Sequence, residues 1–433
     1  MQKSVCILFL AGTLFSCTGN TKQEEVKVKT IDNIIRLSDA IDNIREVNLS
    51  EIADSITYIP LETNEECLLR NTNWFNYSPP YIICSRKVFD QNGKFIRTIG
   101  RIGQGPGEDP TTYMGAIFSK GHFYSYGHKV IEYDENGKFT GKELQVLSNT
   151  NTETEIPTKI HKIGWVDDWA PAGNYFSIYN LPDTVYSVDH NFNIVSAQRV
   201  IPASIPEVQL NNVGYSGFAR AYSCNKDSAL FYNYYNDTIF RVTENGLSPR
   251  YVIDLKEYKI PDDVTLTRQN ELFDTSIRCI RQTRNSVDKK AALKNCLDNC
   301  ELTKLTENKK YVHAAYDTPN YVFMIWKEYV ISPALRGLED QVYPQIAYYN
   351  KQTGETVAVK GRGFIDDIHH KDTYFPNFGI YDNKLYAYFW PYELHEWIDK
   401  QQSAGKSVDK ALLDLSAQVD DEDNPVFMIA HLK

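Results

Sequence analysis

The sequence predicts an all-β fold, namely a six-bladed β-propeller with helical insertions between blades 4 and 5 and within blade 6. Three observations support this prediction: a repeated strand–turn–strand segment, an aromatic content of 13% dominated by Tyr and Phe, and Asn, Gly and Asp at short intervals. Tyr and Phe suit half-buried strands, whereas Asn, Gly and Asp suit the turns between them. The hydrophobic content of 42% supplies enough apolar surface for a large core.

The repeated segment is clearest at Val88–Ile96, where a strand, an Asn-Gly pair and a second strand follow one another, and it recurs at Val130–Phe139. Asn-Gly is the strongest short signal for a β-hairpin, because both residues accept a positive φ. Weaker copies begin at Thr184, Asp237 and Ile346. The first three spacings are about 41, 54 and 54 residues, close to the roughly 40–50 residues of a four-stranded propeller blade.

Two helical patterns, at about 261–308 and 392–418, interrupt the later part of the chain, and their subtraction restores the period. Six blades are expected, with cores near 74–100, 113–145, 162–200, 215–256, 310–360 and 363–433. A strand over 55–61 could pair with the C-terminal strand 426–432 and close the ring without an open edge. A β-sandwich with helical inserts is the alternative, and the repeat argues against it.

The N-terminus predicts export and a lipid anchor. Lys3 and the apolar stretch Val5–Leu14 form a signal peptide over residues 1–16, in which the apolar stretch is too short to span a bilayer as a helix. Leu14-Phe15-Ser16-Cys17 has the form of a bacterial lipobox, so Cys17 is predicted to carry acyl chains that hold the protein on a membrane. An ordinary secretory signal, with Cys17 as a bystander, is the alternative.

After Cys17, residues 17–30 are polar and are predicted to form a flexible tether, and the propeller is expected over 31–433. Lys22-Gln23-Glu24-Glu25 resembles the acidic export signals that send some Gram-negative lipoproteins to the cell surface, but it lies farther from the cysteine than is usual. We therefore expect a lipid-anchored outer-membrane protein and leave two locations open, the cell surface and the periplasmic face.

Charge and motifs narrow the classes of partner. The net charge of −10 gives no general attraction to nucleic acid or to anionic lipid headgroups. No later stretch approaches the length of a transmembrane helix. No nucleophile elbow, zinc-binding helix or cofactor motif is present, so neither a cofactor nor a resident metal is expected. Besides the membrane reached through Cys17, the expected partner is a glycan, a peptide or a protein.

The segment from Phe89 to Glu108 contains Gly93-Lys94-Phe95-Ile96 and Gly103-Gln104-Gly105-Pro106-Gly107. It resembles the signature of six-bladed β-propeller lipoproteins of Gram-negative anaerobes, a group related to NHL-repeat propellers. Shorter matches to that family stand at 58–63, 236–239, 366–368 and 424–426. The resemblance implies the fold and a lipid-anchored location, but no reaction and no catalytic residues. Asp109 departs from the family pattern, which tends to place an aromatic residue there.

The candidate ligand-binding residues are Arg101, Gln104, Glu108, Trp165, Asp167, Asp366, Asp367 and His369. The first three lie in a glycine-rich segment without the Lys-Ser/Thr of a phosphate-binding loop, and a tight connection between blades explains the glycines better. Trp165 and Asp167 offer an aromatic face and a carboxylate, which suit sugar rings or cationic groups. The last three belong to a run of carboxylates and imidazoles, which is interpreted as a solvated loop in preference to a metal site.

Export makes disulfides available to the six cysteines that follow Cys17. Cys296 and Cys300 lie four apart in a helical pattern, and Cys279 in a neighbouring pattern could reach one of them. A disulfide within this group is one interpretation, and a zinc site that recruits His313 is the less favoured one. The other cysteines, Cys67, Cys84 and Cys224, are interpreted as small buried hydrophobic residues.

The expected function is binding or scaffolding through one propeller face or the central channel, because loops on a rigid frame suit recognition. The alternative is a glycan-directed lyase or hydrolase that uses polar residues of the channel, and it rests on analogy of fold alone. At least three convergent Asp, Glu, His or Arg side chains in the channel would favour that enzyme. A third possibility is a structural subunit that docks a partner through the helical insertions.

Overall fold

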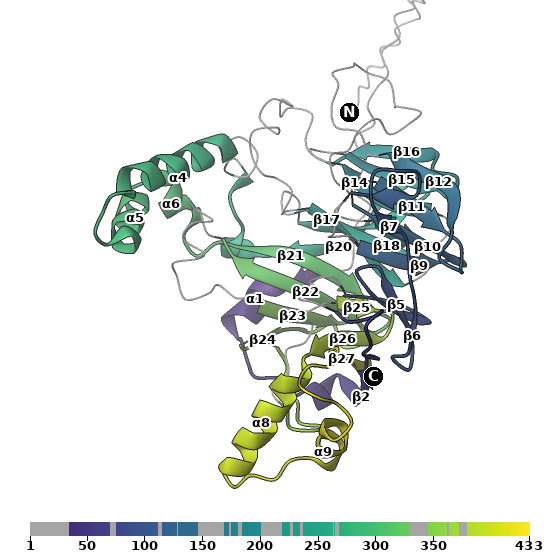
Figure 1. The fold of residues 1–433 in the computed structure, drawn as a ribbon. Helices are drawn as coiled ribbons and strands as arrows, with labels where there is room; N and C mark the ends of the chain where they lie inside the picture. The colour runs from purple at the N-terminus through teal and green to yellow at the C-terminus, as the bar shows by residue number, and fades with distance from the viewer. Residues whose placement is uncertain are drawn as a thin grey trace, which may run out of the picture.

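The computed structural model describes residues 34–69, 75–110, 115–127, 129–145, 169–172, 175–180, 184–200, 219–225, 228–233, 237–262, 264, 268–329, 345–361, 363–371 and 379–433. Within these residues, strands form five four-stranded sheets, one five-stranded sheet and one two-stranded sheet. The sheets are arranged in a propeller-like fold from which helices project (Figure 1). The predicted all-β class is therefore confirmed.

The sheets follow one another along the chain. Sheet 1 contains β3 (Phe75–Ser78), β4 (Tyr81–Cys84), β5 (Lys87–Asp90) and β6 (Phe95–Thr98). Sheet 2 contains β9 (Gly115–Ser119), β10 (His122–Tyr126), β11 (Lys129–Tyr133) and β12 (Phe139–Gln145). Sheet 3 contains β13 (Trp169–Ala172), β14 (Tyr175–Asn180), β15 (Thr184–Asp189) and β16 (Ile194–Arg199). The short strands β7 (Arg101–Ile102) and β8 (Glu108–Asp109) pair with each other between sheets 1 and 2.

The later sheets include strands from the N-terminus. Sheet 4 contains β17 (Ala219–Asn225), β18 (Ser228–Asn233), β19 (Thr238–Thr243), β20 (Gly246–Asp254) and β1 (Ile34–Arg36). Sheet 5 contains β21 (Lys310–Asp317), β22 (Tyr321–Glu328), β23 (Gln345–Asn350) and β24 (Thr356–Val359). Sheet 6 contains β25 (Gly379–Tyr381), β26 (Lys384–Phe389), β27 (Val426–Leu432) and β2 (Ala53–Pro60).

The predicted pairing between the two ends of the chain is confirmed. β2 runs antiparallel to β27, with Ala53 opposite Leu432 and Pro60 opposite Val426. The N-terminal strand thereby becomes the fourth strand of the sheet that contains the C-terminal strand. This pairing satisfies the outer edge of β27 with a strand that precedes sheet 1 in the sequence.

An N-terminal strap, residues 34–52, lies along the outer edges of sheets 4, 5 and 6. In it, β1 pairs in parallel with β20 and is followed by α1 (Leu37–Asp42) and the 3₁₀ helix η1 (Leu49–Glu51). The Arg45 N–H donates to the carbonyl oxygen of Ala358 (3.1 Å), and the Leu49 N–H donates to that of Ile365 (2.7 Å). The strap thus joins three consecutive sheets, an arrangement that the sequence did not predict.

The turn between the third and fourth strands of a sheet carries the repeated motif. Asp90 Oδ1 accepts the backbone N–H groups two and four residues later, at 2.8 and 2.9 Å. Asp134 and Asp189 make the same two contacts in sheets 2 and 3. In the Asn-Gly pair of the first copy, Gly93 has a positive φ (+83°) and Asn92 does not. The aspartate therefore organises a loop of four residues in sheet 1.

Neighbouring sheets are aligned in the same direction. At the contact between sheets 1 and 6, the ring of Phe75 at the start of β3 lies 4.2 Å from that of Tyr388 near the end of β26. Near the opposite end of the same two strands, Lys384 Nζ donates to the hydroxyl of Tyr77 at 3.5 Å. Because the strands of each sheet are antiparallel, successive connections must then lie at alternate ends of the sheets.

This alternation separates the connections by length. The connections between the first and second strands of a sheet, and between its third and fourth strands, contain two to five residues. They lie at one end of the sheets, which we call the short-turn end. Every connection longer than five residues lies at the other end, the long-connection end. The two ends are distinct near the first strand of each sheet. The twist of a sheet, however, brings the turn between its third and fourth strands against the preceding sheet. For example, the Glu62 N–H donates to the carbonyl oxygen of Gly93 at 2.8 Å.

Helices project from the sheets in two arms at separate places (Figure 1). The first arm, residues 268–306, lies between β20 and β21 and contains α4 (Gln269–Thr283), α5 (Lys289–Asp298) and α6 (Glu301–Thr306). The second arm, residues 390–425, lies between β26 and β27 and contains α8 (Pro391–Ser403) and α9 (Lys410–Ser416). Both positions agree with the helical patterns in the sequence. No helix of the described residues is long and apolar enough to span a bilayer.

Candidate functional site

A groove opens at the long-connection end of sheet 5, with a volume of about 920 Å³. The strands of this sheet begin or end beside it, and the strap and the 3₁₀ helix η3 (Lys256–Tyr258) contribute further residues. The lining residues are Ile41, Ile44, Glu257, Tyr258, Glu307, Asn308, Lys309, Lys310, Trp326, Glu328, Gln345, Lys360 and Gly361. The groove thus combines segments that lie up to 320 residues apart in the sequence.

The groove has an aromatic interior and charged walls. Trp326 is 4% exposed, and Lys310 Nζ lies 5.4 Å from the centroid of the Tyr258 ring. Lys310 also forms an ion pair with Glu328 (Nζ to Oε1, 3.3 Å). The Tyr258 hydroxyl donates to Asp42 Oδ1 at 2.5 Å, and this hydrogen bond to the carboxylate raises the pKa of Tyr258. The strap therefore fixes one wall, and the groove offers apolar surface together with charges of both signs.

The loop from 363 to 371 lies at the same end, between sheets 5 and 6. Asp366 is 4% exposed, and its Oδ1 accepts the N–H groups of Ile368 (3.0 Å) and His369 (2.9 Å). Its other carboxylate oxygen is buried without a hydrogen-bond partner among the described residues. Asp366 therefore shapes the loop with one oxygen, and its position does not bring it into the groove.

Asp367 fastens this loop to the strap. It accepts hydrogen bonds from the backbone N–H of Ser50 (2.9 Å) and from the Ser50 hydroxyl (2.5 Å). Burial raises the pKa of Asp367, but the hydrogen bonds to its carboxylate, led by the two from Ser50, and the charge of His370 together outweigh burial, so the pKa lies below its usual value. The ionised carboxylate is thus the form that holds the strap against the loop.

His369 connects the loop to the closing strand β2. Its Nδ1 lies 3.2 Å from the hydroxyl of Tyr58, and the two ring centroids are 5.5 Å apart. Burial raises the pKa of Tyr58, and the nearby charges of Asp366 and Asp409 raise it further. Since Asp409 is the N-cap of α9, the loop lies between the strap, the closing strand and the second arm. Asp367 and His369 thus hold the loop to the strap and to the closing strand.

The glycine-rich segment between sheets 1 and 2 is compact. Glu108 turns back onto its own loop, where its Oε2 accepts the Gly105 N–H at 3.1 Å. Gly107 has a φ of +72°, and a Cβ atom there would lie 2.6 Å from the ring of Phe139. The segment therefore forms a close connection between sheets, as predicted, and the phosphate-loop interpretation is not needed. Arg101 and Gln104, by contrast, are exposed on this loop.

The structure does not gather the predicted candidates into one site. Arg101, Gln104 and Glu108 lie between sheets 1 and 2, whereas Asp366, Asp367 and His369 share the loop between sheets 5 and 6. Trp165, Asp167 and Cys17 lie outside the described residues. The groove around Lys310 was not predicted from the sequence. The one local signal was Trp326-Lys327-Glu328, an aromatic and charged run at the end of a strand.

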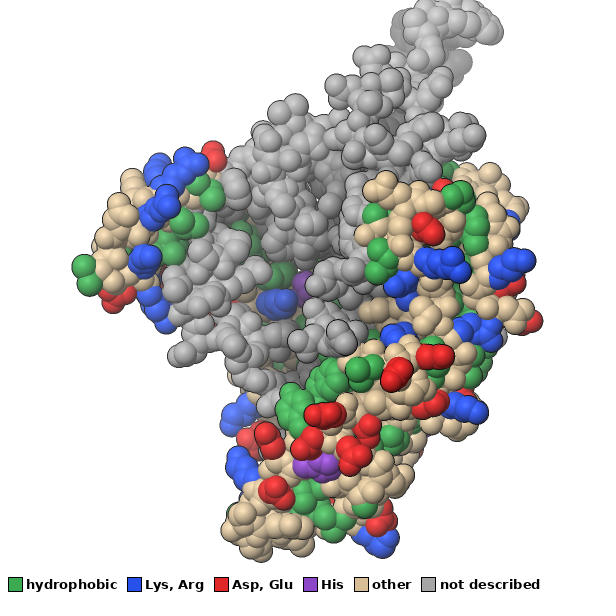
Figure 2. Space-filling view, viewed as in Figure 1, with side chains coloured by type: hydrophobic (Ala, Val, Ile, Leu, Met, Phe, Trp, Pro, Cys, Tyr) green, Lys and Arg blue, Asp and Glu red, His purple; other side chains and the backbone are tan. Residues whose placement is uncertain are grey.

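The two arms carry opposite charge (Figure 2). Eight basic and five acidic side chains give the first arm a net charge of +3. Three basic and nine acidic side chains give the second arm a net charge of −6. The exposed cations near the tip of the first arm are Arg281, Arg284, Lys289, Lys290 and Lys294. The exposed anions of the second arm include Glu396, Asp399, Asp420, Asp421 and Glu422.

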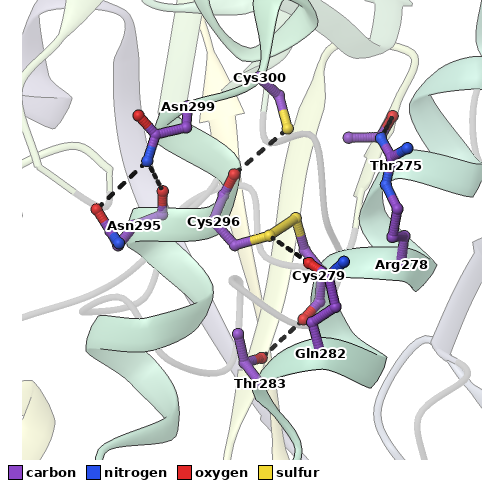
Figure 3. The surroundings of a disulfide bond; sticks show 9 residues. All are labelled: Thr275, Arg278, Cys279, Gln282, Thr283, Asn295, Cys296, Asn299 and Cys300. Atoms are coloured by element: carbon purple, nitrogen blue, oxygen red, sulfur yellow. Dashed lines mark hydrogen bonds between the residues drawn. A yellow bond between two sulfur atoms is a disulfide. The ribbon is translucent and has the colours of Figure 1, made fainter.

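Three cysteines meet in the first arm. The structure contains a disulfide between Cys279 of α4 and Cys296 of α5, with Cα atoms 5.7 Å apart, and Cys300 stands beside it (Figure 3). Among the described residues, no group of three or more His, Cys, Asp and Glu side chains could hold a metal ion. His313 lies on β21 and not with these cysteines. The side chain of Cys224 is not among those described.

Comparisons with known proteins identify a family and a fold. A family model described as "Domain of unknown function (DUF4934)" matches residues 32–431. A solved structure from Bacteroides fragilis NCTC 9343 is similar to this chain, with a TM-score of 0.57 and 16% sequence identity. The alignment covers 90% of this chain and 98% of that chain, and the name of that protein describes it as exported by inference. At this identity the likeness supports the fold alone.

Two other solved structures are more distant. BamB from Moraxella catarrhalis has a TM-score of 0.30 and 11% identity, covering 70% of this chain and 63% of that chain. A streptogramin B lyase has a TM-score of 0.32 and 11% identity, covering 71% and 88%. These scores are too low to carry an argument. No curated protein matches the chain.

Proposed function

The chain belongs to the DUF4934 family, a domain of unknown function, and on that premise we propose that it is an exported propeller that binds a protein or peptide at its long-connection end. One observation carries the proposal: every connection longer than five residues, both arms and the groove lie at that end. Variable loops on a rigid scaffold are the usual arrangement of recognition surfaces. Among the described strands, the connections at the short-turn end contain only two to five residues.

We propose that the propeller has six blades, namely the five four-stranded sheets and the sheet that β1 extends to five strands. The β2–β27 pairing supports a closed ring, because it gives the final blade its fourth strand from the N-terminus. A closed ring of blades also explains how a chain of this length presents six long connections between blades at one end. In this assignment, β1 is part of the strap and not of a blade.

The opposite charges of the two arms favour a protein or peptide over a neutral glycan. Complementary charge steers association and selects the orientation of a partner. A partner that spans both arms would present an acidic surface to Arg281 and Arg284 and a basic surface to Glu396 and Asp399. The groove, with Tyr258 and a floor of buried apolar side chains, would then accept an apolar or aromatic side chain between the two charged contacts.

A lipid anchor on Cys17 is the second part of the proposal. The lipobox at residues 14–17 supports it, and the family match begins at residue 32, which leaves the anchor and the tether outside the propeller. Two signals are normally needed for stable anchoring, and a diacylated cysteine supplies two chains. Metabolic labelling with a palmitate analogue should mark the wild-type protein and vanish in Cys17→Ala. Labelling that persists in the variant would contradict the anchor.

The binding proposal is tested on peptide and glycan arrays with the purified chain. We expect peptide hits that weaken when salt is raised, because exposed charges are screened. The variant Arg281→Glu/Arg284→Glu should lose these hits, whereas Lys138→Glu, an exposed control at the short-turn end, should keep them. Hits confined to glycans, or equal losses in both variants, would contradict a peptide-binding surface on the arms. No observation among the described residues favours the glycan lyase or hydrolase.

A further inference from the structure

The first arm contains a thiol next to a disulfide. Cys279 of α4 is bonded to Cys296 of α5, and the Cys300 thiol donates to the carbonyl oxygen of Cys296 at 3.3 Å (Figure 3). All three cysteines belong to one small apolar cluster with Leu293 and Leu297. Cys300 has no disulfide partner. A free thiol beside a disulfide in an exported chain is a candidate for thiol chemistry.

We propose that Cys300 is the attacking thiol of an internal thiol–disulfide exchange. The Cys300 thiolate attacks the sulfur of Cys296, a Cys296–Cys300 bond forms, and Cys279 leaves as a thiolate. Cys300 gives up a proton to solvent and Cys279 takes one up, so the exchange neither oxidises nor reduces the protein as a whole. The arm therefore has two disulfide states with equal numbers of thiols and disulfides.

Access favours Cys296 as the sulfur that is attacked, and the Cys300 thiol already lies against the Cys296 backbone. Cys279 is 1% exposed, whereas Cys296 and Cys300 are half-buried. Residues four apart on a helix have Cβ atoms about 5–6 Å apart, and a disulfide needs about 3.5–4.5 Å. The helix α5 ends at Asp298, so the backbone just before Cys300 is no longer helical and can close this gap.

The exchange changes what holds the arm together. In the state seen here, the disulfide joins α4 to α5 across a cluster with few apolar side chains. In the other state both sulfurs of the disulfide lie at the end of α5, and α4 keeps only its packing contacts. The cations of α4, including Arg281 and Arg284, would then move independently of those on α5. The inference depends on the cysteines alone and stands whether or not the arm binds a partner.

The test is a trapping experiment on the full-length chain. The protein is incubated at pH 8 in glutathione buffers of increasing thiol fraction, quenched with acid, blocked with N-ethylmaleimide and digested for mass spectrometry. We expect a peptide linked through Cys296 and Cys300, with the blocking group on Cys279. In Cys300→Ser the linked peptide should be lost, and Cys279 should become blocked only together with Cys296 through direct reduction by glutathione, whereas Cys67→Ser, a control at a buried cysteine outside the arm, should keep the linked peptide.

A second measurement does not depend on the variants. Trypsin should cleave after Arg281 and Arg284 faster in the glutathione buffer than in its absence, because the exchange frees α4 from α5. Three outcomes would overturn the proposal: the native link alone at every thiol fraction, a Cys279–Cys300 link, or glutathione attached to Cys300 without blocked Cys279. If Cys300→Ser fails to fold, the trapped linkages of the wild-type chain still decide between these results.

Discussion

Asn424 donates its side-chain amide to the carbonyl oxygen of Cys67 at 3.1 Å, across 357 positions of sequence. The same amide donates to the carbonyl oxygen of Glu62 (2.6 Å), and Asn424 Oδ1 accepts the Leu69 N–H (2.7 Å). Asn424 is completely buried, so these contacts replace water for three backbone groups. One side chain therefore binds the segment between β2 and β3 to the residue that precedes the last strand.

Replacement of Asn424 should weaken the closure of the ring. Asn424→Ala would leave the buried backbone groups of Cys67 and Leu69 without this partner, at a cost of about 2–4 kcal/mol in the free energy of unfolding, while the Glu62 carbonyl oxygen would keep the Cys67 thiol as a donor. The measurement is denaturant unfolding at equilibrium. Asn136→Ala, at an exposed turn, is the control and should change stability by less than about 0.5 kcal/mol. Equal effects of the two substitutions would show that Asn424 does not secure the closure.

Two glycines with a positive φ separate backbone strain from crowding. Gly107 (φ +72°) faces the ring of Phe139, whereas Gly121 (φ +80°) has no heavy atom within 4 Å of its would-be Cβ. Gly121→Ala should cost only the backbone strain, about 1–2 kcal/mol. Gly107→Ala should cost a further ~1–3 kcal/mol, because Phe139 must move. Thermal unfolding of both variants checks this, and equal costs would disprove the close packing at Gly107.

The disulfide of the first arm should stabilise the arm and not the sheets. Cys279 and Cys296 are 17 residues apart, and closure of a loop of this length is worth about 3 kcal/mol. In Cys279→Ser/Cys296→Ser, amide hydrogen exchange should speed up in α4 and α5, while protection in sheets 1 and 6 stays unchanged. If exchange accelerates throughout the sheets instead, the arm is not an independent unit of stability.

The second arm should be more stable in acid than in base. Its His395 lies 2.5 Å from Asp421 Oδ1, and this hydrogen bond raises the pKa of His395 above 6.5 in spite of burial. The protonated ring is favoured in the folded state, so its contribution is complete below about pH 6.5 and is lost as pH rises through the folded pKa. Hydrogen exchange of α8 and α9 between pH 6 and 8 measures this loss.

A matched pair of variants isolates the histidine. His395→Gln should remove the pH dependence of exchange in α8 and α9 while it leaves the helices in place. His122→Gln, on β10 and away from the arm, should keep the dependence. If the second arm becomes more protected as pH rises, the sign of this linkage is wrong. If the dependence persists in His395→Gln, another group causes it.

The sequence predicted those parts of the fold that depend on local patterns. Alternating apolar residues located the strands, and the repeated Asp-x-Asn-Gly segment located the outer turn of a sheet. The closing pair was predictable because a strand near residue 58 and a strand near residue 429 both lacked neighbours in sequence. The loop at this Asn-Gly pair is longer than a two-residue hairpin turn because Asp90 accepts two backbone N–H groups.

The strap and the groove could not be predicted in this way. β1 has only three residues and forms because it pairs with the edge of β20. The sequence around residue 34 contains no pattern that indicates this pairing. The groove brings Ile41, Tyr258, Lys310 and Lys360 together by tertiary folding. Among the candidates, Asp366 and Asp367 were correctly placed in a loop, but their hydrogen bonds to the loop and to Ser50 show structural use of those carboxylates.

Site-specific photocrosslinking in intact cells tests whether the long-connection end binds the partner. A photoreactive phenylalanine replaces Tyr392 on the second arm or Glu307 in the groove, with Glu135 and Thr353 at the short-turn end as controls; all four are exposed. We predict discrete adducts from the first two positions and none from the controls. Adducts from Glu135 or Thr353, with none from Tyr392 and Glu307, would contradict the account.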